Sequence, residues 1–199
     1  MSTVTLCRAV PPSYLGFCHN QAFWKEMVME IALTTCNIRS WNWKDLASIV
    51  HHANNRKVWI NLRDRFPHPY TFADARSWLQ SVSEHRPETN FAIVVDDVAV
   101  GGIGFTLQQD VAYRSAEIGY WLGEEYWGQG IATEALKAVT EHAFSEYDLC
   151  RLYAHVFEWN QASARVLEKA GYLFEGRLRM SVTKDGQTID QLMYAFTRD

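Results

Sequence analysis

The stretch "WGQGIAT", residues 127–133, places two glycines directly before a run of helix-forming residues. The first amides of a helix have no intrahelical acceptor and carry a partial positive charge. Because glycine has no side chain, an anionic group can approach these amides closely. We therefore predict that Gly128 and Gly130 form a turn that binds a phosphate-bearing ligand, the alternative being a tight turn without one.

Two common nucleotide motifs do not fit this turn. A P-loop requires a lysine followed by Ser or Thr after its second glycine, and residues 131–133 are Ile-Ala-Thr. A dinucleotide fingerprint needs a third glycine or small residue at the position of Thr133. It also opens the first βαβ unit, whereas this turn lies past the middle of the chain. The pyrophosphate of coenzyme A remains as the third candidate.

The elements around the turn follow from periodicity. "AEIGYWL" alternates and predicts a strand before it, with Glu117, Gly119 and Trp121 on one face. "IATEALKAVTEHAF" has apolar residues at helical spacing and predicts a helix after it. A strand "RLYAHVF" and a helix "NQASARVLEKAG" come next, the helix with Asn160 as N-cap and Gly171 after its end. A final hairpin turns at Asp185-Gly186.

The first half of the domain is predicted from the same kinds of signal. Thr71 and Asp74 fit a capping box at the start of a helix, and Asp96-Asp97 fits a hairpin turn. In chain order, the expected elements are a strand "ALTTCNIRSW", a helix "NWKDLASIVHHANN", a loop and helix "RDRFPHPYTFADARSWL", and the strands "NFAIVV" and "VAVGGIGFTL". The whole order predicts a mixed α/β domain, α+β-like, over residues 31–199. Residues 1–30 have no clear period and are interpreted as an N-terminal extension.

Composition limits the functional classes. The chain has 199 residues, 48% hydrophobic and 21% charged, with a net charge of −4. It has no basic stripe, so nucleic acid is not expected as a partner. It also has no apolar run of about 18 residues, so no membrane span is expected. The four cysteines lack metal or redox spacing and are interpreted as reduced thiols of a cytoplasmic protein. No metal is expected.

The ordered set "AEIGYWLGEEYWGQGIATEAL", "RLYAHVFEWNQASARVLEKAGYLFEG" and a final hairpin resembles the GCN5-related N-acetyltransferases (GNAT). It is most similar to their RimJ/RimL branch, the ribosomal-protein N-terminal acetyltransferases. The resemblance covers residues from about 31 to the C-terminus. It implies a central twisted mixed sheet with a splayed strand pair and flanking helices.

The resemblance also implies acetyl-CoA as cosubstrate. In the family, the splayed strand and the following turn hold the cofactor, which places the backbone of Leu122 against the thioester and pantetheine. Trp127 departs from the Arg or Gln that many members have at the first position of the motif, which puts a side-chain contact there in doubt. The amides implied to meet the pyrophosphate are those of Gly128, Gln129, Gly130, Ile131, Ala132 and Thr133.

Amine acetylation needs a base for the amine, a polarised carbonyl and a proton for the leaving thiolate. Family members transfer the acetyl group directly in a ternary complex, so Cys150 is not expected to be a nucleophile. By resemblance, Glu117 is the candidate base, acting directly or through water, and its alternative role is an ion pair with Arg or Lys. Leu167 stands where many family members have the tyrosine that serves as the acid. Ser163 is instead the candidate to protonate the sulfur of coenzyme A or to hydrogen-bond it. Asn160 would cap its helix and bind the pantetheine arm.

Glu134 and His155 are weaker candidates for the base. Aromatic residues, among them Trp59, Tyr70, Tyr120 and Trp121, are candidates to line an acceptor groove or to fill a core.

The acceptor is left open by the sequence. A protein N-terminal amine follows from the branch, and the alternatives are a small amine, such as a polyamine, an aminoglycoside or an amino-acid-like molecule. A non-catalytic acyl-CoA-binding regulatory domain is a further alternative from another class. Arg63 and Arg65 would meet an acidic acceptor or form a solvated surface. The oligomeric state is open, a homodimer included.

Overall fold

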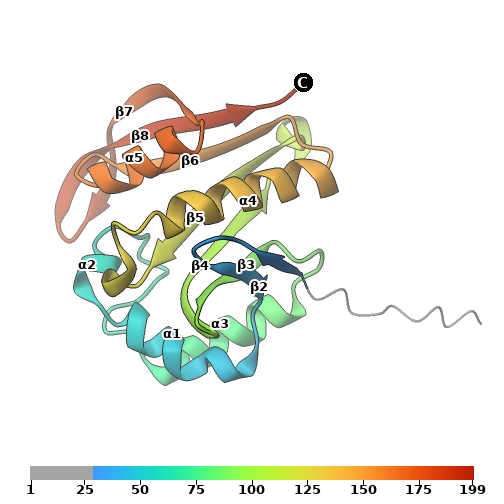
Figure 1. Ribbon diagram of the computed structural model, residues 1–199. Coiled ribbons are helices and arrows are strands. Elements are labelled where there is room, and N and C mark those ends of the chain that lie inside the picture. The colour runs from blue at the N-terminus through green and yellow to red at the C-terminus, as the bar shows by residue number, and fades with distance from the viewer. Residues whose placement is uncertain (1–28) are drawn as a thin grey trace, which may run out of the picture.

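Eight strands form one mixed sheet that carries helices on both faces (Figure 1). The computed structural model describes residues 29–199. The expected extension at residues 1–30 therefore lies outside the described residues, apart from Met29 and Glu30. The strands are β1 (Glu30–Ala32), β2 (Asn37–Ser40), β3 (Asn90–Val95), β4 (Val98–Leu107), β5 (Ser115–Leu122), β6 (Arg151–Phe157), β7 (Leu173–Lys184) and β8 (Gln187–Thr197). The α-helices are α1 (Leu46–Ala53), α2 (Arg56–Trp59), α3 (Phe72–Glu84), α4 (Ile131–Glu146) and α5 (Gln161–Lys169).

The strand order is β1-β2-β3-β4-β5-β6-β8-β7. Six of the seven neighbouring pairs are antiparallel, and β5 with β6 is the parallel pair. Parallel neighbours need a long crossover, and α4 supplies it. The glycine turn therefore lies at the start of the crossover helix, where β5 has just left the sheet.

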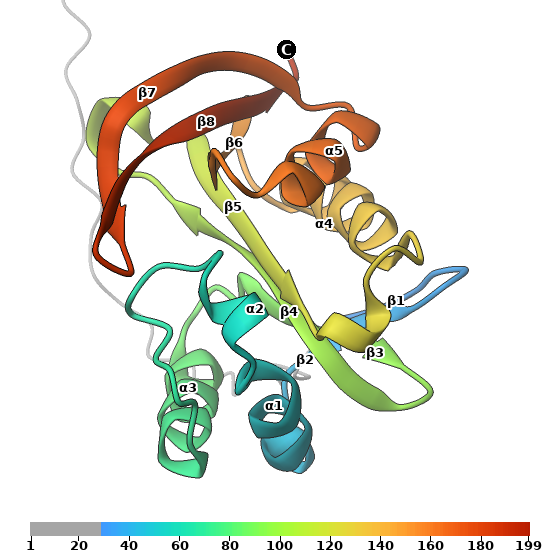
Figure 2. The ribbon, with the colours of Figure 1, turned by 90° about the vertical axis from the view of Figure 1, so that its left-hand side faces the viewer.

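The helices divide between the two faces of the sheet. α4 and α5 cover one face, and α1, α2 and α3 lie on the other (Figure 2). The main core lies under α4, where Leu136 and Val139 pack with Ile118 and Leu152 of the strands, all 2% exposed or less. A second cluster, with Ile49 of α1, Leu79 of α3 and Tyr70, seals the other face.

Most of the predicted local signals are confirmed. Thr71 and Asp74 form the expected capping box of α3. Asp96 and Asp97 have φ of 47° and 63°, as a tight hairpin turn requires. Asn160 caps α5 by accepting a hydrogen bond from the Ser163 amide at 3.2 Å. The expected alternation of β5 also holds, because Ala116, Ile118 and Leu122 are buried while Glu117, Gly119 and Trp121 are more exposed.

One prediction of extent was wrong, and one short helix was not predicted. The strand expected over residues 32–41 is a hairpin of β1 and β2, with a turn closed by the Leu33 amide and the Cys36 carbonyl at 3.0 Å. Helix α2 was not predicted because it has only four residues, too few to show a helical period. The side chain of Asn55 caps it by accepting from the Lys57 amide at 2.8 Å.

Two expectations from composition bear on the described residues. Cys36 and Cys150 are free thiols there, and Cys36 is buried. None of the helices in residues 29–199 combines the length and the apolar character that crossing a membrane requires.

Candidate active site

Strands β5 and β6 are paired only at their beginnings. Ser115, Ala116 and Glu117 pair with Arg151–Tyr153, and beyond Glu117 the two strands separate (Figure 1). The backbone edge of residues 118–122 that faces β6 therefore has no strand partner. A cleft of about 1360 Å³ runs along this gap and continues past β4 to α3. The splayed pair expected from the resemblance is present.

The glycine turn lies at one end of this cleft. Gly128 and Gly130 have φ of 76° and 84°, a left-handed backbone that favours glycine. A Cβ added at either position would meet no atom within 4 Å, so the space beside the turn is open. Gly130 is the N-cap of α4 and offers no side-chain cap. Within residues 29–199, five amides of the turn donate to no acceptor, namely those of Gly128, Gln129, Gly130, Ile131 and Ala132.

Thr133 and Leu122 differ from these five positions, because their backbone groups are already hydrogen-bonded. The Thr133 amide donates to the Gly130 carbonyl at 3.0 Å, which closes the first turn of the helix. The indole Nε1 of Trp127 donates to the Leu122 carbonyl at 2.8 Å. This hydrogen bond therefore connects the residue directly before the glycine turn to the end of β5. A carbonyl has two lone pairs, so the Leu122 oxygen retains one acceptor position.

Ser163 lies in the first turn of α5 and faces β5 across the cleft. Its Oγ is 2.9 Å from the hydroxyl of Tyr120, and that hydroxyl also donates to the Ser163 carbonyl at 3.2 Å. Burial raises the pKa of Tyr120 well above its ordinary value, and the hydrogen bond with Ser163 only partly offsets this. The phenol therefore stays protonated near neutral pH. Two hydroxyl groups thus meet beside the gap between β5 and β6.

Glu117 occupies the point where the two strands part. Its carboxylate bonds the Arg63 guanidinium and accepts from His155 Nδ1 at 3.1 Å. Burial alone would raise the pKa of Glu117, but the His155 hydrogen bond and the Arg63 charge outweigh it and lower the pKa. Glu117 is therefore ionised at neutral pH and holds the imidazole in one orientation. All three side chains line the cleft.

The other predicted residues separate into those at the cleft and those elsewhere. Glu134 lies outside it, because its carboxylate accepts from the Thr34 amide at 2.8 Å and the Thr35 amide at 2.9 Å and so fixes the β1–β2 turn. Leu167 is fully buried in the core under α5. Neither position offers a base or an acid to the cleft.

The far wall of the cleft is aromatic. Tyr70 and Trp121 line it and both contact Phe66, with ring centroids 4.8 and 5.7 Å apart. Trp59, another groove candidate, does not line this cleft. Its ring stacks on His68 and lies 3.6 Å beneath the Nζ of Lys184.

Lys184 joins Trp59 and Asp64 to the last hairpin. It is 2% exposed, and its Nζ donates to Asp64 Oδ1 at 2.7 Å. Next to it, Arg56 and Asp185 form an ion pair at 2.6 Å. The tip of β7 and β8 is therefore fixed to the segment that follows α1.

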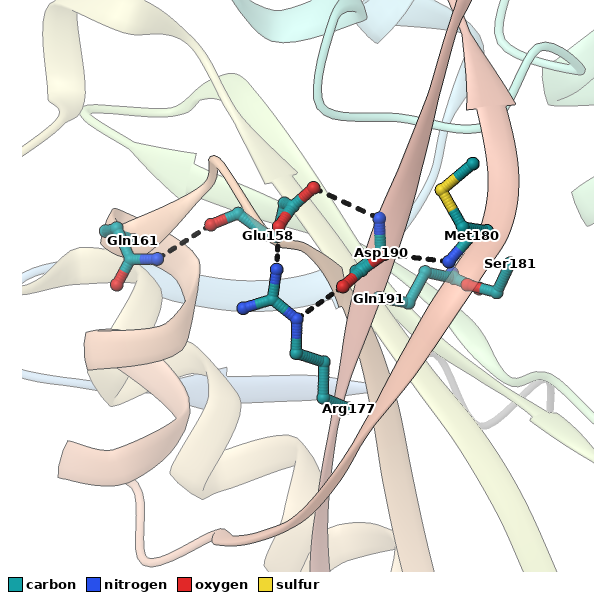
Figure 3. A network of polar contacts seen from close by, with 7 residues as sticks. All are labelled: Glu158, Gln161, Arg177, Met180, Ser181, Asp190 and Gln191. Atoms are coloured by element: carbon teal, nitrogen blue, oxygen red, sulfur yellow. Dashed lines mark hydrogen bonds and ion pairs between the residues drawn. The ribbon is translucent and has the colours of Figure 1, made fainter.

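The turn between β6 and α5 is held by a polar network (Figure 3). The guanidinium of Arg177 in β7 bridges the carboxylates of Glu158 and Asp190. The Asp190 amide donates to Glu158 Oε1 at 3.2 Å, and Gln161 Nε2 donates to the Glu158 carbonyl at 2.7 Å. Because Glu158 lies two residues before Asn160, this network positions the start of α5 and therefore Ser163.

Two contacts at the site were not predicted from the sequence, that of His155 with Glu117 and that of Tyr120 with Ser163. His155, the weaker base candidate, lies on β6 two residues beyond Tyr153, the register partner of Glu117, and its Nδ1 lies 3.1 Å from the Glu117 carboxylate. Tyr120 was a candidate to line an acceptor groove or to fill a core, and no contact with Ser163 was predicted. The alternation of β5 places Tyr120 on the same face as Ala116, Ile118 and Leu122, and from this face its hydroxyl reaches Ser163 of α5.

The chain matches known proteins over most of its described length. Residues 36–173 match the model of the acetyltransferase (GNAT) domain. "Uncharacterized N-acetyltransferase YoaA" of Bacillus subtilis is 39% identical over 100 residues, 50% of this chain and 55% of the relative. The "ribosomal-protein-serine acetyltransferase" of Escherichia coli is 32% identical over 105 residues, 53% of this chain and 58% of the relative. The chain thus spans little more than half the length of these relatives.

Solved structures support the same assignment. RimJ of Mycobacterium smegmatis, solved in complex with CoA-disulfide, superimposes with a TM-score of 0.70 at 26% identity, covering 85% of this chain and 86% of that one. The match to the domain model spans more than half of the chain and includes β5, the glycine turn and α5. The chain therefore belongs to the acetyltransferase (GNAT) domain family.

Proposed function

We propose that this protein transfers an acetyl group from acetyl-CoA to the α-amine of a protein N-terminus, by direct transfer in a ternary complex. The observation that carries the proposal is the continuity of one cleft. It joins a glycine turn with unpartnered amides, the gap between β5 and β6, and two sets of proton-handling side chains. Each of these parts matches one demand of the reaction.

The cofactor would lie along the β5 side of the cleft. Its pyrophosphate would accept from the amides of the glycine turn, where the dipole of α4 favours negative charge. The pantetheine amides would take the place of β6 along the free edge of residues 118–122. The thioester would then lie close to Tyr120 and Ser163, with Asn160 at the start of α5 beside the arm.

Glu117 and His155 would remove the amine proton. The carboxylate is ionised and bonded to His155 Nδ1, so the other ring nitrogen of the imidazole is left to accept a proton directly or through water. Arg63 would keep Glu117 charged as His155 gains its proton. In this arrangement Glu117 orients the base and stabilises its cationic form.

Tyr120 and Ser163 would complete the transfer. The amine nitrogen attacks the thioester carbonyl carbon, the carbon–sulfur bond breaks, and the electron pair leaves on sulfur. The thiolate then takes a proton from the Ser163 hydroxyl, which regains one from Tyr120 or water. A phenol whose pKa burial has raised remains protonated in the resting site, as this step requires.

A protein N-terminus is favoured as acceptor by the relatives and by the shape of the site. The matched proteins include a ribosomal-protein-serine acetyltransferase and RimJ. The cleft continues past Trp121 and Phe66 toward α3, which leaves room for an extended peptide on the side away from the glycine turn. A peptide α-amine would enter beside Glu117.

Thiol release from acetyl-CoA, measured against an acceptor panel, tests the proposal. The panel contains peptides with free Ser, Ala or Met N-termini, the same peptides with a blocked α-amine, spermidine and an aminoglycoside. Release with free peptides only, with the added mass on the α-amine, is the expected result. Release with spermidine or the aminoglycoside alone would overturn the protein acceptor and retain the reaction. Absence of acetyl-CoA binding by calorimetry would overturn both.

A further inference from the structure

Three side chains of the types that bind metals meet near the segment that leads into the glycine turn, outside the cleft residues used above. His51 and His52 lie in the last turn of α1, and Glu125 lies in a short 3-10 helix, Glu124–Tyr126. This short helix ends directly before Trp127 and the glycine turn. The three side chains therefore join α1 to the segment that leads into the proposed pyrophosphate site.

The ligand atoms are spaced as the corners of a coordination polyhedron. Glu125 Oε1 is 3.2 Å from His51 Nε2 and 3.9 Å from His52 Nδ1. All three atoms lie within 4.8 Å of one another. Zinc bonds to nitrogen and oxygen are about 2.0–2.2 Å, which separates tetrahedral ligand atoms by about 3.4 Å. Small side-chain rotations would bring all three atoms to that separation.

The environment of His52 is the strongest indication that this group binds a ligand. His52 is only 6% exposed, and neither ring nitrogen has a hydrogen-bond partner among the described residues within normal distance. Neither nitrogen is among the fully enclosed polar atoms without a partner in the described residues, so a metal ion can reach the ring. A Cβ at Gly123 would lie 2.7 Å from His52 Nδ1, so the absence of a side chain there keeps that nitrogen uncovered.

We propose that His51, His52 and Glu125 bind a divalent transition metal of the zinc class, with water completing the coordination. Two imidazoles and one carboxylate suit Zn²⁺ or Ni²⁺, whereas Mg²⁺ prefers an all-oxygen set and retains its water. The expectation of no metal was based on the spacing of the cysteines alone and did not consider histidine or glutamate. The adjacent pairs "HH" and "EE" come together only through the fold.

The metal would hold the entrance of the glycine turn in place. The Glu125 carbonyl already accepts from Gln129 Nε2 at 2.9 Å, inside that turn. Glu124, its neighbour, accepts from Asn55 Nδ2 at 2.9 Å and pairs with Lys57 of α2. A bound metal would strengthen the existing contact of His51 with Glu125 and add His52 to it, so it stabilises the folded protein.

Zinc titration of the chelator-treated full chain tests the site by calorimetry and by thermal unfolding. We expect binding of one Zn²⁺ with a rise in melting temperature, and no rise with Mg²⁺. The variants His51→Ala and Glu125→Gln alter exposed side chains and are expected to weaken Zn²⁺ binding at least about tenfold. His85→Ala removes an exposed histidine elsewhere and is the matched control.

Cobalt distinguishes this site from the cysteines. Co²⁺ bound by nitrogen and oxygen gives visible d–d bands without the near-ultraviolet charge-transfer band of a thiolate. We expect d–d bands that are lost in His51→Ala and Glu125→Gln and kept in His85→Ala. A thiolate band, or Zn²⁺ affinity unchanged in both variants, would overturn the proposal. None of these readouts depends on acetyl transfer.

Discussion

The Tyr120 hydroxyl lies 2.9 Å from the Oγ of Ser163, and this contact joins the free edge of β5 to the first turn of α5. The two groups come from segments 43 residues apart. They meet where β5 and β6 have separated, so the hydroxyl pair faces the gap rather than a neighbouring strand. If the leaving thiolate lies in this gap, both groups should affect the chemical step more than binding.

Tyr120→Phe removes one hydroxyl and retains the ring. We expect kcat to fall on the order of 10²-fold with little change in CoA affinity, because general acids act mainly in the transition state. Ser163→Ala should produce a loss of similar size, and the double variant should lose less than the product of the two. Steady-state kinetics with calorimetric CoA binding measures both quantities.

A matched control for Tyr120→Phe is Tyr172→Phe. Tyr172 is also a buried phenol and shares a hydrogen bond with Thr140 at 2.8 Å, away from the cleft. Its variant should lose some stability and retain kcat. Equal kcat losses in the two variants would mean that the effect of Tyr120→Phe is structural.

Arg63 tests the electrostatics of Glu117. The charge of Arg63 is one of the causes that lower the pKa of the carboxylate. Arg63→Gln removes this charge and therefore raises the pKa of Glu117. As the pH is lowered, the carboxylate is then protonated at a higher pH, and activity that needs the ionised carboxylate is lost earlier. The acidic limb of the profile of kcat/KM against pH should therefore move upward in pH.

Arg65→Gln is the control for that profile. Arg65 also lines the cleft, but within the described part of the chain it forms no ion pair with Glu117. Its variant should keep the acidic limb of the wild type. An unmoved limb in Arg63→Gln would exclude Glu117 as the group that sets it.

Gly130→Ala tests the glycine turn. With φ of 84° and no atom within 4 Å of an added Cβ, alanine would strain the backbone without a collision inside the protein. The strain and the methyl group beside the anion position should weaken CoA binding at least about tenfold, since about 1.4 kcal/mol is a tenfold change. Gly176→Ala has equal space and no left-handed φ, and CoA affinity measured by calorimetry should not change there.

How far the sequence predicts the site depends on whether its signals are local. The glycine turn, the Asn160 cap and the alternation of β5 each depend on a few adjacent residues, and all three have the expected form. The contacts of Glu117 with Arg63 and His155 span 54 and 38 residues. Such pairings depend on strand register and loop packing, which periodicity does not encode. The resemblance placed Glu117, but not its partners.

Cys36 provides a prediction about stability. Burial raises the pKa of its thiol to about 11, and nearby Glu134 adds to this effect. An unfolded cysteine loses its proton near pH 8.5, so the unfolded state gains relative to the folded state as the pH rises from about 8.5 to about 11. The stabilising contribution is complete below that window. In urea unfolding, Cys36→Ala should lose less stability than the wild type over this pH window. Cys150→Ala should lose as much as the wild type, because Cys36 is still present.

Lys184 provides the last prediction, because its amine is buried while its partner Asp64 is exposed. The side chains are 2% and 72% exposed, and their atoms are 2.7 Å apart. Lys184→Met keeps the length of the side chain and removes its charge, whereas Asp64→Asn leaves a buried charge without a carboxylate. Because an unpaired buried charge destabilises more than a missing pair, Asp64→Asn should reduce the free energy of unfolding more than Lys184→Met does, by on the order of 1 kcal/mol. Urea unfolding measures the difference.

Asp148→Asn is the control, because Asp148 forms an exposed pair with Arg114, and it should change the free energy of unfolding little. An equally small effect of Asp64→Asn would contradict the prediction and show that Trp59 alone accommodates the Lys184 charge.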